Sequence, residues 1–181
     1  MSTASQPTLT PETAAAFRDF IAQTLAQELE TTKRVLNAIP DDQCGYRPSE
    51  KCRTAREIAW HIAKEDVLFL DQICEGKFDF TDKRYDGQEP RTIAEMVDWY
   101  DRNLTRSLGK VRSLTPQQLA EPLDFLGMAT LPRVQYLLLM NSHSIHHRGQ
   151  LSAYLRPMGA KVPSIYGPSA DTEEAKASAA D

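Results

Sequence analysis

Hydrophobic residues recur at three- and four-residue steps along most of this chain, which is the period of an amphipathic α-helix. Polar residues that typically start helices stand in front of several of these stretches. Thr10 and Pro11 supply an N-cap and a proline at the first helical position, and the segment that they open continues to Pro40. The pattern therefore predicts a first long helix from residue 11 to the end of this segment.

Two capping boxes predict the next two helices. Thr54 and Glu57 are spaced so that each side chain can accept a hydrogen bond from the backbone N–H of the other residue. The helix that follows should continue to about Gly76. Thr92 and Glu95 repeat the device in front of a third amphipathic stretch, IAEMVDWYDRNLTRSLGKV.

The second half of the chain predicts one short and one long helix. Thr115 and Pro116 open a short helical piece that ends near Pro122, and Leu131–Met158 is typical of a long helix closed by Gly159. No segment alternates apolar and polar residues over six or more positions, and β-branched residues do not cluster. We therefore expect almost no sheet.

This element order predicts an all-α fold, a four-helix bundle with one short extra helix. The connections at 40–53 and 76–91 are longer than tight turns, and the second is polar and acidic, so we expect them to wall a pocket. Residues 1–9 and 169–181 are small and polar, which predicts disordered tails around one domain at 10–168.

Composition excludes several classes of partner. The 181 residues carry a net charge of −4, and the basic residues are scattered, so the basic patch of a nucleic-acid-binding protein is missing. The longest apolar run, YLLLM at 136–140, is far below the roughly 20 residues needed to cross a membrane. Three cysteines without Cys-x-x-Cys spacing, behind a polar N-terminus, predict a cytoplasmic protein.

Three of the four histidines fall within five positions of the last predicted helix. His143 and His147 are four residues apart, so both imidazoles project from one helix face and can hold one metal ion. His61, on the inward face of the second predicted helix, is a third candidate ligand. Buried imidazoles need partners for their nitrogen atoms, and a bound cation would provide one.

A structural role explains the same spacing equally well. An inward histidine such as His61 can be a core residue hydrogen-bonded to a carbonyl group, and pairs spaced H-x-x-x-H arise by chance. Ser144 stands where the helix of zinc proteases carries its glutamate, so the H-E-x-x-H motif is absent. Spacing alone therefore leaves metal ligands and core histidines both open.

Several motifs together resemble the DinB/YfiT-like family over about residues 11–167. They are His61 in the stretch AWHIAKE, the run HSIHHRGQL at 143–151, and the downstream sequence YLRPMGAKVPSIYG at 154–167. The resemblance implies a four-helix bundle in an up-down-down-up arrangement, often dimeric, which holds a divalent metal between its helices through three histidines.

The resemblance also implies the ligands and the chemistry. His61, His143 and His147 would bind the metal; zinc is the default, and imidazole ligands also suit nickel, iron and manganese. Three protein ligands leave a coordination position open, as in catalytic sites. Relatives include S-transferases and an isomerase that use low-molecular-weight thiols, and metal-dependent hydrolases. We expect a thiol S-transferase or a hydrolase with a small-molecule substrate.

Two alternatives stay open. One is a non-catalytic metal-binding protein of the stress response on the same scaffold. The other is a helical interaction module that binds no metal and whose histidines belong to its core.

Five further residues receive an expected role. Glu65, one turn after the histidine of the second helix, is a candidate catalytic proton carrier, although it could equally be a surface charge. Gln150 could contact a ligand or fill a polar position, and His146 is expected to flank the site. Arg148 should point away from the metal and pair with acidic groups, and Gly149 should permit close approach of a neighbouring helix.

Overall fold

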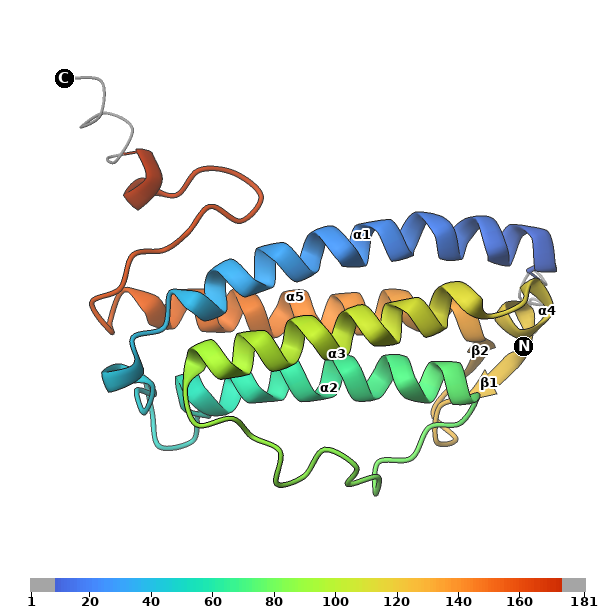
Figure 1. Ribbon diagram of the computed structural model, residues 1–181, viewed down its shortest axis with the longest axis horizontal. Coiled ribbons are helices and arrows are strands. Elements are labelled where there is room, and N and C mark those ends of the chain that lie inside the picture. The colour runs from blue at the N-terminus through green and yellow to red at the C-terminus, as the bar shows by residue number, and fades with distance from the viewer. Residues whose placement is uncertain (1–8, 174–181) are drawn as a thin grey trace, which may run out of the picture.

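Four long helices form a single bundle in the computed structural model, which describes residues 9–173 (Figure 1). The long helices are α1 (Pro11–Asn37), α2 (Ala55–Glu75), α3 (Ile93–Ser113) and α5 (Tyr136–Leu155). In Figure 1, α2 and α3 run in the same direction, opposite to α1 and α5. This is the expected all-α bundle in its up-down-down-up arrangement.

The predicted start signals form the helix caps. The Thr54 hydroxyl accepts from Glu57 N at 3.2 Å, and the Glu57 carboxylate accepts from Thr54 N at 2.7 Å. Thr92 and Glu95 make the same pair of bonds at the start of α3. Gly76 ends α2 with a φ of 73°, a left-handed conformation that glycine adopts without strain.

The connection between α2 and α3 is long because the two helices run in the same direction. A helix of 21 residues such as α2 is about 31 Å long, so the chain must return over that length before α3 begins. Residues 76–92 make this return along the outside of α2 (Figure 1). Tyr85 anchors the segment, because it is buried and its hydroxyl donates to Asp71.

The N-terminal part of the predicted last helix is not helical. Strand β1 (Pro122–Asp124) pairs antiparallel with β2 (Thr130–Pro132), and a 3-10 turn η2 (Arg133–Gln135) precedes α5. The long helix therefore begins at Tyr136 instead of Leu131 and ends at Leu155. Strands of three residues are too short to show alternation, and the Tyr136 hydroxyl ties the hairpin to α5 by donating to Leu123 O at 2.9 Å.

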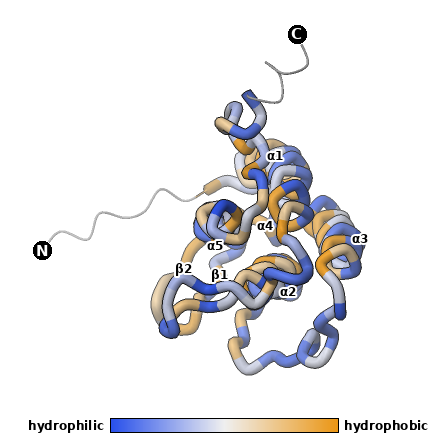
Figure 2. Tube along the Cα trace, turned by 90° about the vertical axis from the view of Figure 1, so that its left-hand side faces the viewer, coloured by the Kyte–Doolittle hydropathy of each residue, from blue (hydrophilic) through white to orange (hydrophobic). Residues whose placement is uncertain are grey.

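The remaining short elements lie at the ends of the bundle. A 3-10 turn η1 (Asp41–Gln43) lies between α1 and α2, and α4 (Pro116–Ala120) is the predicted short helix. Figure 2 views the bundle along its long axis, where α1, α2, α3 and α5 surround the shared core. Among residues 9–173, no helix combines the length and apolar character needed to cross a membrane.

Both predicted tails have an inner part that the structure describes. Leu9 packs against the core. Residues 170–173 form a helical turn, and Asp171 accepts from Val162 N at 2.9 Å and from Arg156 Nη2 at 3.0 Å. The rest of the predicted tails, 1–8 and 174–181, lie outside the described residues, so the domain limits stay a prediction.

Gly149 does not mediate a close helix contact, contrary to expectation. It is exposed, and a Cβ atom built on it meets no atom within 4 Å. Because glycine is a poor helix former, Gly149→Ala should raise the free energy of unfolding of the metal-free protein by about 0.5–1 kcal/mol, measured by urea denaturation.

Gly76→Ala is the opposing control. Its φ of 73° disfavours a side chain, and the new Cβ would collide with the Arg133 guanidinium group, so this variant should be destabilised. A loss of stability in Gly149→Ala as well would contradict the reading of Gly149 as a plain interior helix position.

Candidate metal centre

Three predicted ligands converge between α2 and α5. His61 comes from α2, and His143 and His147 come from adjacent turns of α5. His61 Nε2 lies 3.1 Å from His143 Nε2 and 3.2 Å from His147 Nε2. One nitrogen atom of each ring lies within 4.8 Å of the other two, a separation at which one metal ion could contact all three.

The opposite nitrogen atom of each ring faces an oxygen atom. The pairs are His61 Nδ1 with Glu65 Oε1 at 4.0 Å, His143 Nδ1 with Asp66 Oδ1 at 3.6 Å, and His147 Nδ1 with Gln150 Oε1 at 3.2 Å. An acceptor beside Nδ1 favours the tautomer that carries its proton there. In that tautomer the Nε2 atom carries the lone pair that can bind a metal ion.

Burial favours the neutral form of His61 and His147. It lowers the pKa of His61 to about 3, and the positive charge of Arg53 and the other two imidazoles lower it further. Burial likewise lowers the pKa of His147. Neutral imidazole is the form that binds metal ions, so these two rings each offer a lone pair at neutral pH.

Asp66 is the functional candidate that sequence reasoning missed. Its side chain is fully buried, and Oδ2 accepts from Tyr100 Oη at 2.7 Å. Among residues 9–173, no hydrogen-bond donor reaches Oδ1, the atom that faces His143. The available signal was its position, because Asp66 interrupts an apolar stripe of α2 midway between Ile62 and Leu70.

The other predicted site residues lie next to the three histidines but are not part of the cluster. Glu65 lies beside His61 and also pairs with Lys64 Nζ at 3.2 Å, so both expected roles are compatible with its place. Gln150 bonds His147 and donates to Tyr154 Oη at 3.4 Å. His146 is exposed, with its ring centroid 4.9 Å from that of His147. The roles of Glu65, Gln150 and His146 stay predictions.

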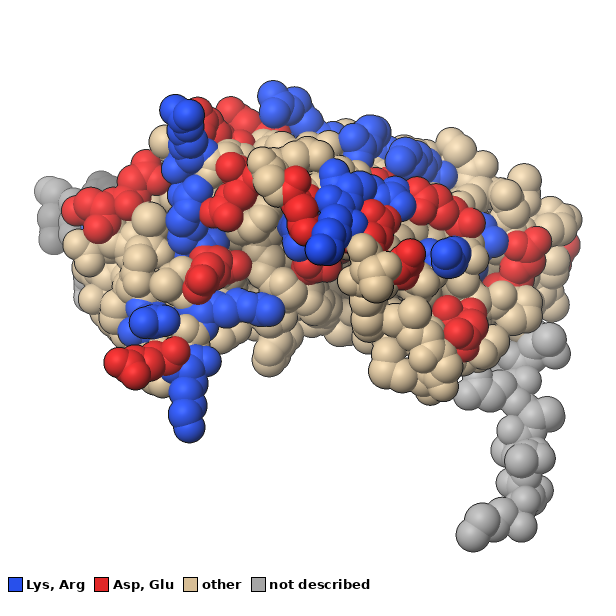
Figure 3. All heavy atoms as spheres, turned by 90° about the horizontal axis from the view of Figure 1, so that it is seen from below, with Lys and Arg blue, Asp and Glu red and all other residues tan. Residues whose placement is uncertain are grey.

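Two hollows open beside the histidines, and the 76–92 segment walls both. One has a volume of about 250 Å³ and is lined by His61, Glu65, Phe69, Phe80, Phe125, Leu139 and His143. The other, of about 330 Å³, is charged and is lined by His61, Lys64, Glu65, Leu68, Phe80, Asp82, Lys83 and Asp86. On the lower face of the molecule, acidic and basic side chains are interspersed and no single sign dominates (Figure 3).

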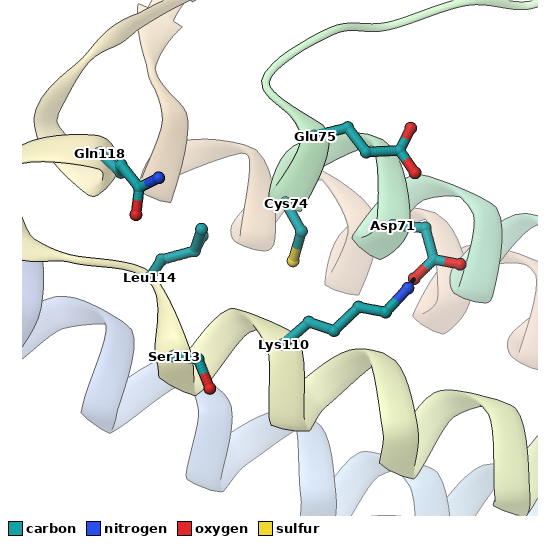
Figure 4. Close-up of a pocket in the computed structure, with 7 residues that line it drawn as sticks. All are labelled: Asp71, Cys74, Glu75, Lys110, Ser113, Leu114 and Gln118. Atoms are coloured by element: carbon teal, nitrogen blue, oxygen red, sulfur yellow. Dashed lines mark hydrogen bonds and ion pairs between the residues drawn. The ribbon is translucent and has the colours of Figure 1, made fainter.

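A larger hollow of about 560 Å³ lies at the other end of α2, away from the histidines. In Figure 4 the Lys110 amine points at the Asp71 carboxylate, with Nζ 2.8 Å from Oδ1. Burial raises the pKa of the nearby Cys74 thiol to about 11, so the thiol stays protonated at neutral pH. The three-histidine cluster is therefore the better candidate for chemistry.

Comparison with known proteins agrees with this fold. The family model described as the DinB family matches residues 12–177. This chain belongs to the DinB family. Two curated Bacillus subtilis (strain 168) proteins are similar to this DinB protein, and both are called uncharacterized. YrdA is 25% identical over 78% of this chain and 83% of its own length, and YjoA is 27% identical over 71% and 82%.

Solved DinB structures share the fold. A DinB-like protein from Bacillus subtilis, YjoA, matches 82% of this chain and 99% of its own with a TM-score of 0.65 at 25% identity. A DinB-like protein from Bacillus cereus matches 81% and 95% with a TM-score of 0.66 at 26% identity. The resemblance seen in the motifs is thus confirmed at the level of family and fold.

Proposed function

We propose that this DinB protein binds one divalent metal ion through His61, His143 and His147. The observation that carries the proposal is the close approach of three imidazoles, with His61 Nε2 next to Nε2 of both His143 and His147. Each Nδ1 lies beside an oxygen atom, which favours a lone pair on each Nε2, and one cation among the three Nε2 atoms would bind all of these lone pairs. The unpartnered Asp66 Oδ1 supports the same conclusion, because orienting a ligand would explain why this atom is buried.

Zinc is the metal we infer, because imidazole suits it and three protein ligands match its catalytic sites. Nickel, iron or manganese would use the same donors. When bound, the metal supplies Lewis acidity to an oxygen or sulfur atom of a small molecule.

We further propose that the protein is an enzyme, a thiol S-transferase or a hydrolase. Both reactions remove a proton from the attacking thiol or water. We assign the acceptance of that proton to the Glu65 carboxylate, and this assignment is supported by the position of Glu65 in both hollows and beside His61. The hollows favour an enzyme over a non-catalytic metal-binding protein, because they give a small molecule access to His61.

Metal content per chain tests the metal site. Protein purified without a polyhistidine tag and loaded with zinc should carry about one metal ion per chain, measured by plasma mass spectrometry. The double variant His143→Ala/His147→Ala should carry none, because one remaining imidazole cannot hold the ion.

His146→Ala is the matched control, because it removes an exposed histidine from the same helix. It should keep the full metal content. Equal metal in the double variant and the parent, or none in the parent after reconstitution with zinc or nickel, would refute the site. Turnover of the loaded parent with a thiol and an electrophile separates the enzyme from the non-catalytic alternative.

A further inference from the structure

The hollow beside His61 and His143 is an aromatic chamber. We use this name for the hollow of about 250 Å³ whose apolar walls are Phe69, Phe80, Phe125 and Leu139. Its polar groups, the two histidines and Glu65, belong to the metal centre. The volume is below the range of pockets that enclose whole drug-sized ligands, and suits one ring-sized group.

Separate parts of the chain build the chamber walls. Phe69 lies two turns beyond His61 on α2, Leu139 lies one turn before His143 on α5, and Phe125 comes from the β-hairpin. The Phe125 ring is 5.8 Å from that of Phe69 and 5.5 Å from that of Phe80, measured between centroids. Such an assembly of rings offers edge-to-face contacts to a further aromatic group.

Phe80 reaches the chamber from the 76–92 segment, whose backbone is fixed beside it. Buried Gln72 of α2 donates from Nε2 to Asp79 O at 2.9 Å, and its Oε1 accepts from Asp79 N at 3.3 Å. Despite this support, Phe80 is 65% exposed and Leu139 is 43% exposed. These apolar side chains are exposed to water beside a polar site. A ligand that covers them buries apolar surface, which lowers the free energy of the complex.

We propose that the substrate carries a compact apolar group, preferably aromatic, that binds in the aromatic chamber while its reacting atom faces the histidines. Phe80 then determines specificity for this group. The inference rests on the proposed function, since it names the substrate class of the same site. The charged hollow shares His61, Glu65 and Phe80 with the chamber and leaves room for a polar remainder of the substrate.

Two thiols that differ in one phenyl ring test the inference. On zinc-loaded protein, 2-phenylethanethiol should bind at least about tenfold more tightly than ethanethiol by titration calorimetry, because only its ring can fill the chamber. Two carbon atoms separate the ring from the sulfur, so the two thiols are similarly acidic. Zinc content is measured again after each titration.

Phe80→Ser and Phe20→Ser form a matched pair of variants. Phe80 is 65% exposed in the chamber wall, and Phe20 is 68% exposed on α1 and lines neither hollow at the histidines. Phe80→Ser should reduce the preference for the phenyl ring severalfold and leave ethanethiol binding unchanged. Phe20→Ser should leave both affinities as in the parent.

A second probe separates this inference from the proposed function. With metal-free protein, 2-phenylethanol should show saturation transfer by NMR that is lost in Phe80→Ser and kept in Phe20→Ser. If the protein fails to bind metal but shows this pattern of saturation transfer, the proposed metal-dependent function is refuted and the aromatic chamber is still supported as a binding site.

Three results overturn the inference. One is equal affinity for the two thiols on protein with full zinc content. Another is saturation transfer that is absent from the parent or unaffected by Phe80→Ser. The third is a dimer of the parent that Phe80→Ser dissociates in analytical ultracentrifugation, because the chamber would then be covered by a second copy of the chain.

Discussion

Replacing Arg148 with methionine is expected to lower the free energy of unfolding by about 3–5 kcal/mol, measured by urea denaturation. The Arg148 side chain is 1% exposed, and its Nη1 lies 2.6 Å from Glu28 Oε2 and 3.1 Å from Thr32 Oγ1. Tyr166 links Arg148 to Glu28. Its hydroxyl accepts a hydrogen bond from Arg148 and donates one to Glu28 at 3.0 Å. Methionine would leave the Glu28 carboxylate largely buried without its cation.

Arg156→Met is the matched control for that loss. Arg156 follows the last residue of α5 and pairs with Asp171 at 3.0 Å, but its side chain is 57% exposed. Exposed ion pairs contribute about 0–1 kcal/mol, so this variant should stay close to the parent. Similar losses in both variants would mean that burial of the Arg148 pair is not what makes it costly to break.

The bundle could be predicted from the sequence because its signals are local. Thr54 and Thr92 each begin a helix with a capping box, and hydrophobic periodicity marks the faces that pack. The hairpin could not be predicted in this way. Its strands have three residues each, and their pairing depends on contacts such as the Tyr136 hydroxyl with Leu123 O.

The candidate site could likewise be predicted only where its signals are local. The spacing of His143 and His147 places both on one face of α5, whereas joining them with His61 required either the family resemblance or the fold. Asp66 was missed because a carboxylate in the charged run KED is typical of a helix surface. The chamber wall at Phe80 depends on a connection whose course no local pattern specifies.

Asp66→Asn is expected to weaken zinc binding about 10- to 100-fold, measured by competition with a chromophoric chelator. The Asp66 carboxylate only accepts hydrogen bonds, and its Oδ1 lies 3.6 Å from His143 Nδ1, so it favours the tautomer of His143 with the proton on Nδ1 and the lone pair on Nε2. In the variant, the amide oxygen would accept from the Tyr100 hydroxyl, which leaves the amide NH₂ facing His143. That donor favours the tautomer with the proton on Nε2, where it blocks the metal.

Asp71→Asn distinguishes this tautomer effect from a general loss of stability. Asp71 is also 1% exposed on α2, but it accepts from Ser107 at 2.8 Å and pairs with Lys110, away from the histidines. Asp71→Asn should lower the free energy of unfolding and leave zinc affinity unchanged, with the helix content of both variants checked by circular dichroism. If both variants lost affinity equally, Asp66 would act only through folding. If Asp66→Asn bound zinc like the parent, the tautomer of His143 would not depend on this carboxylate.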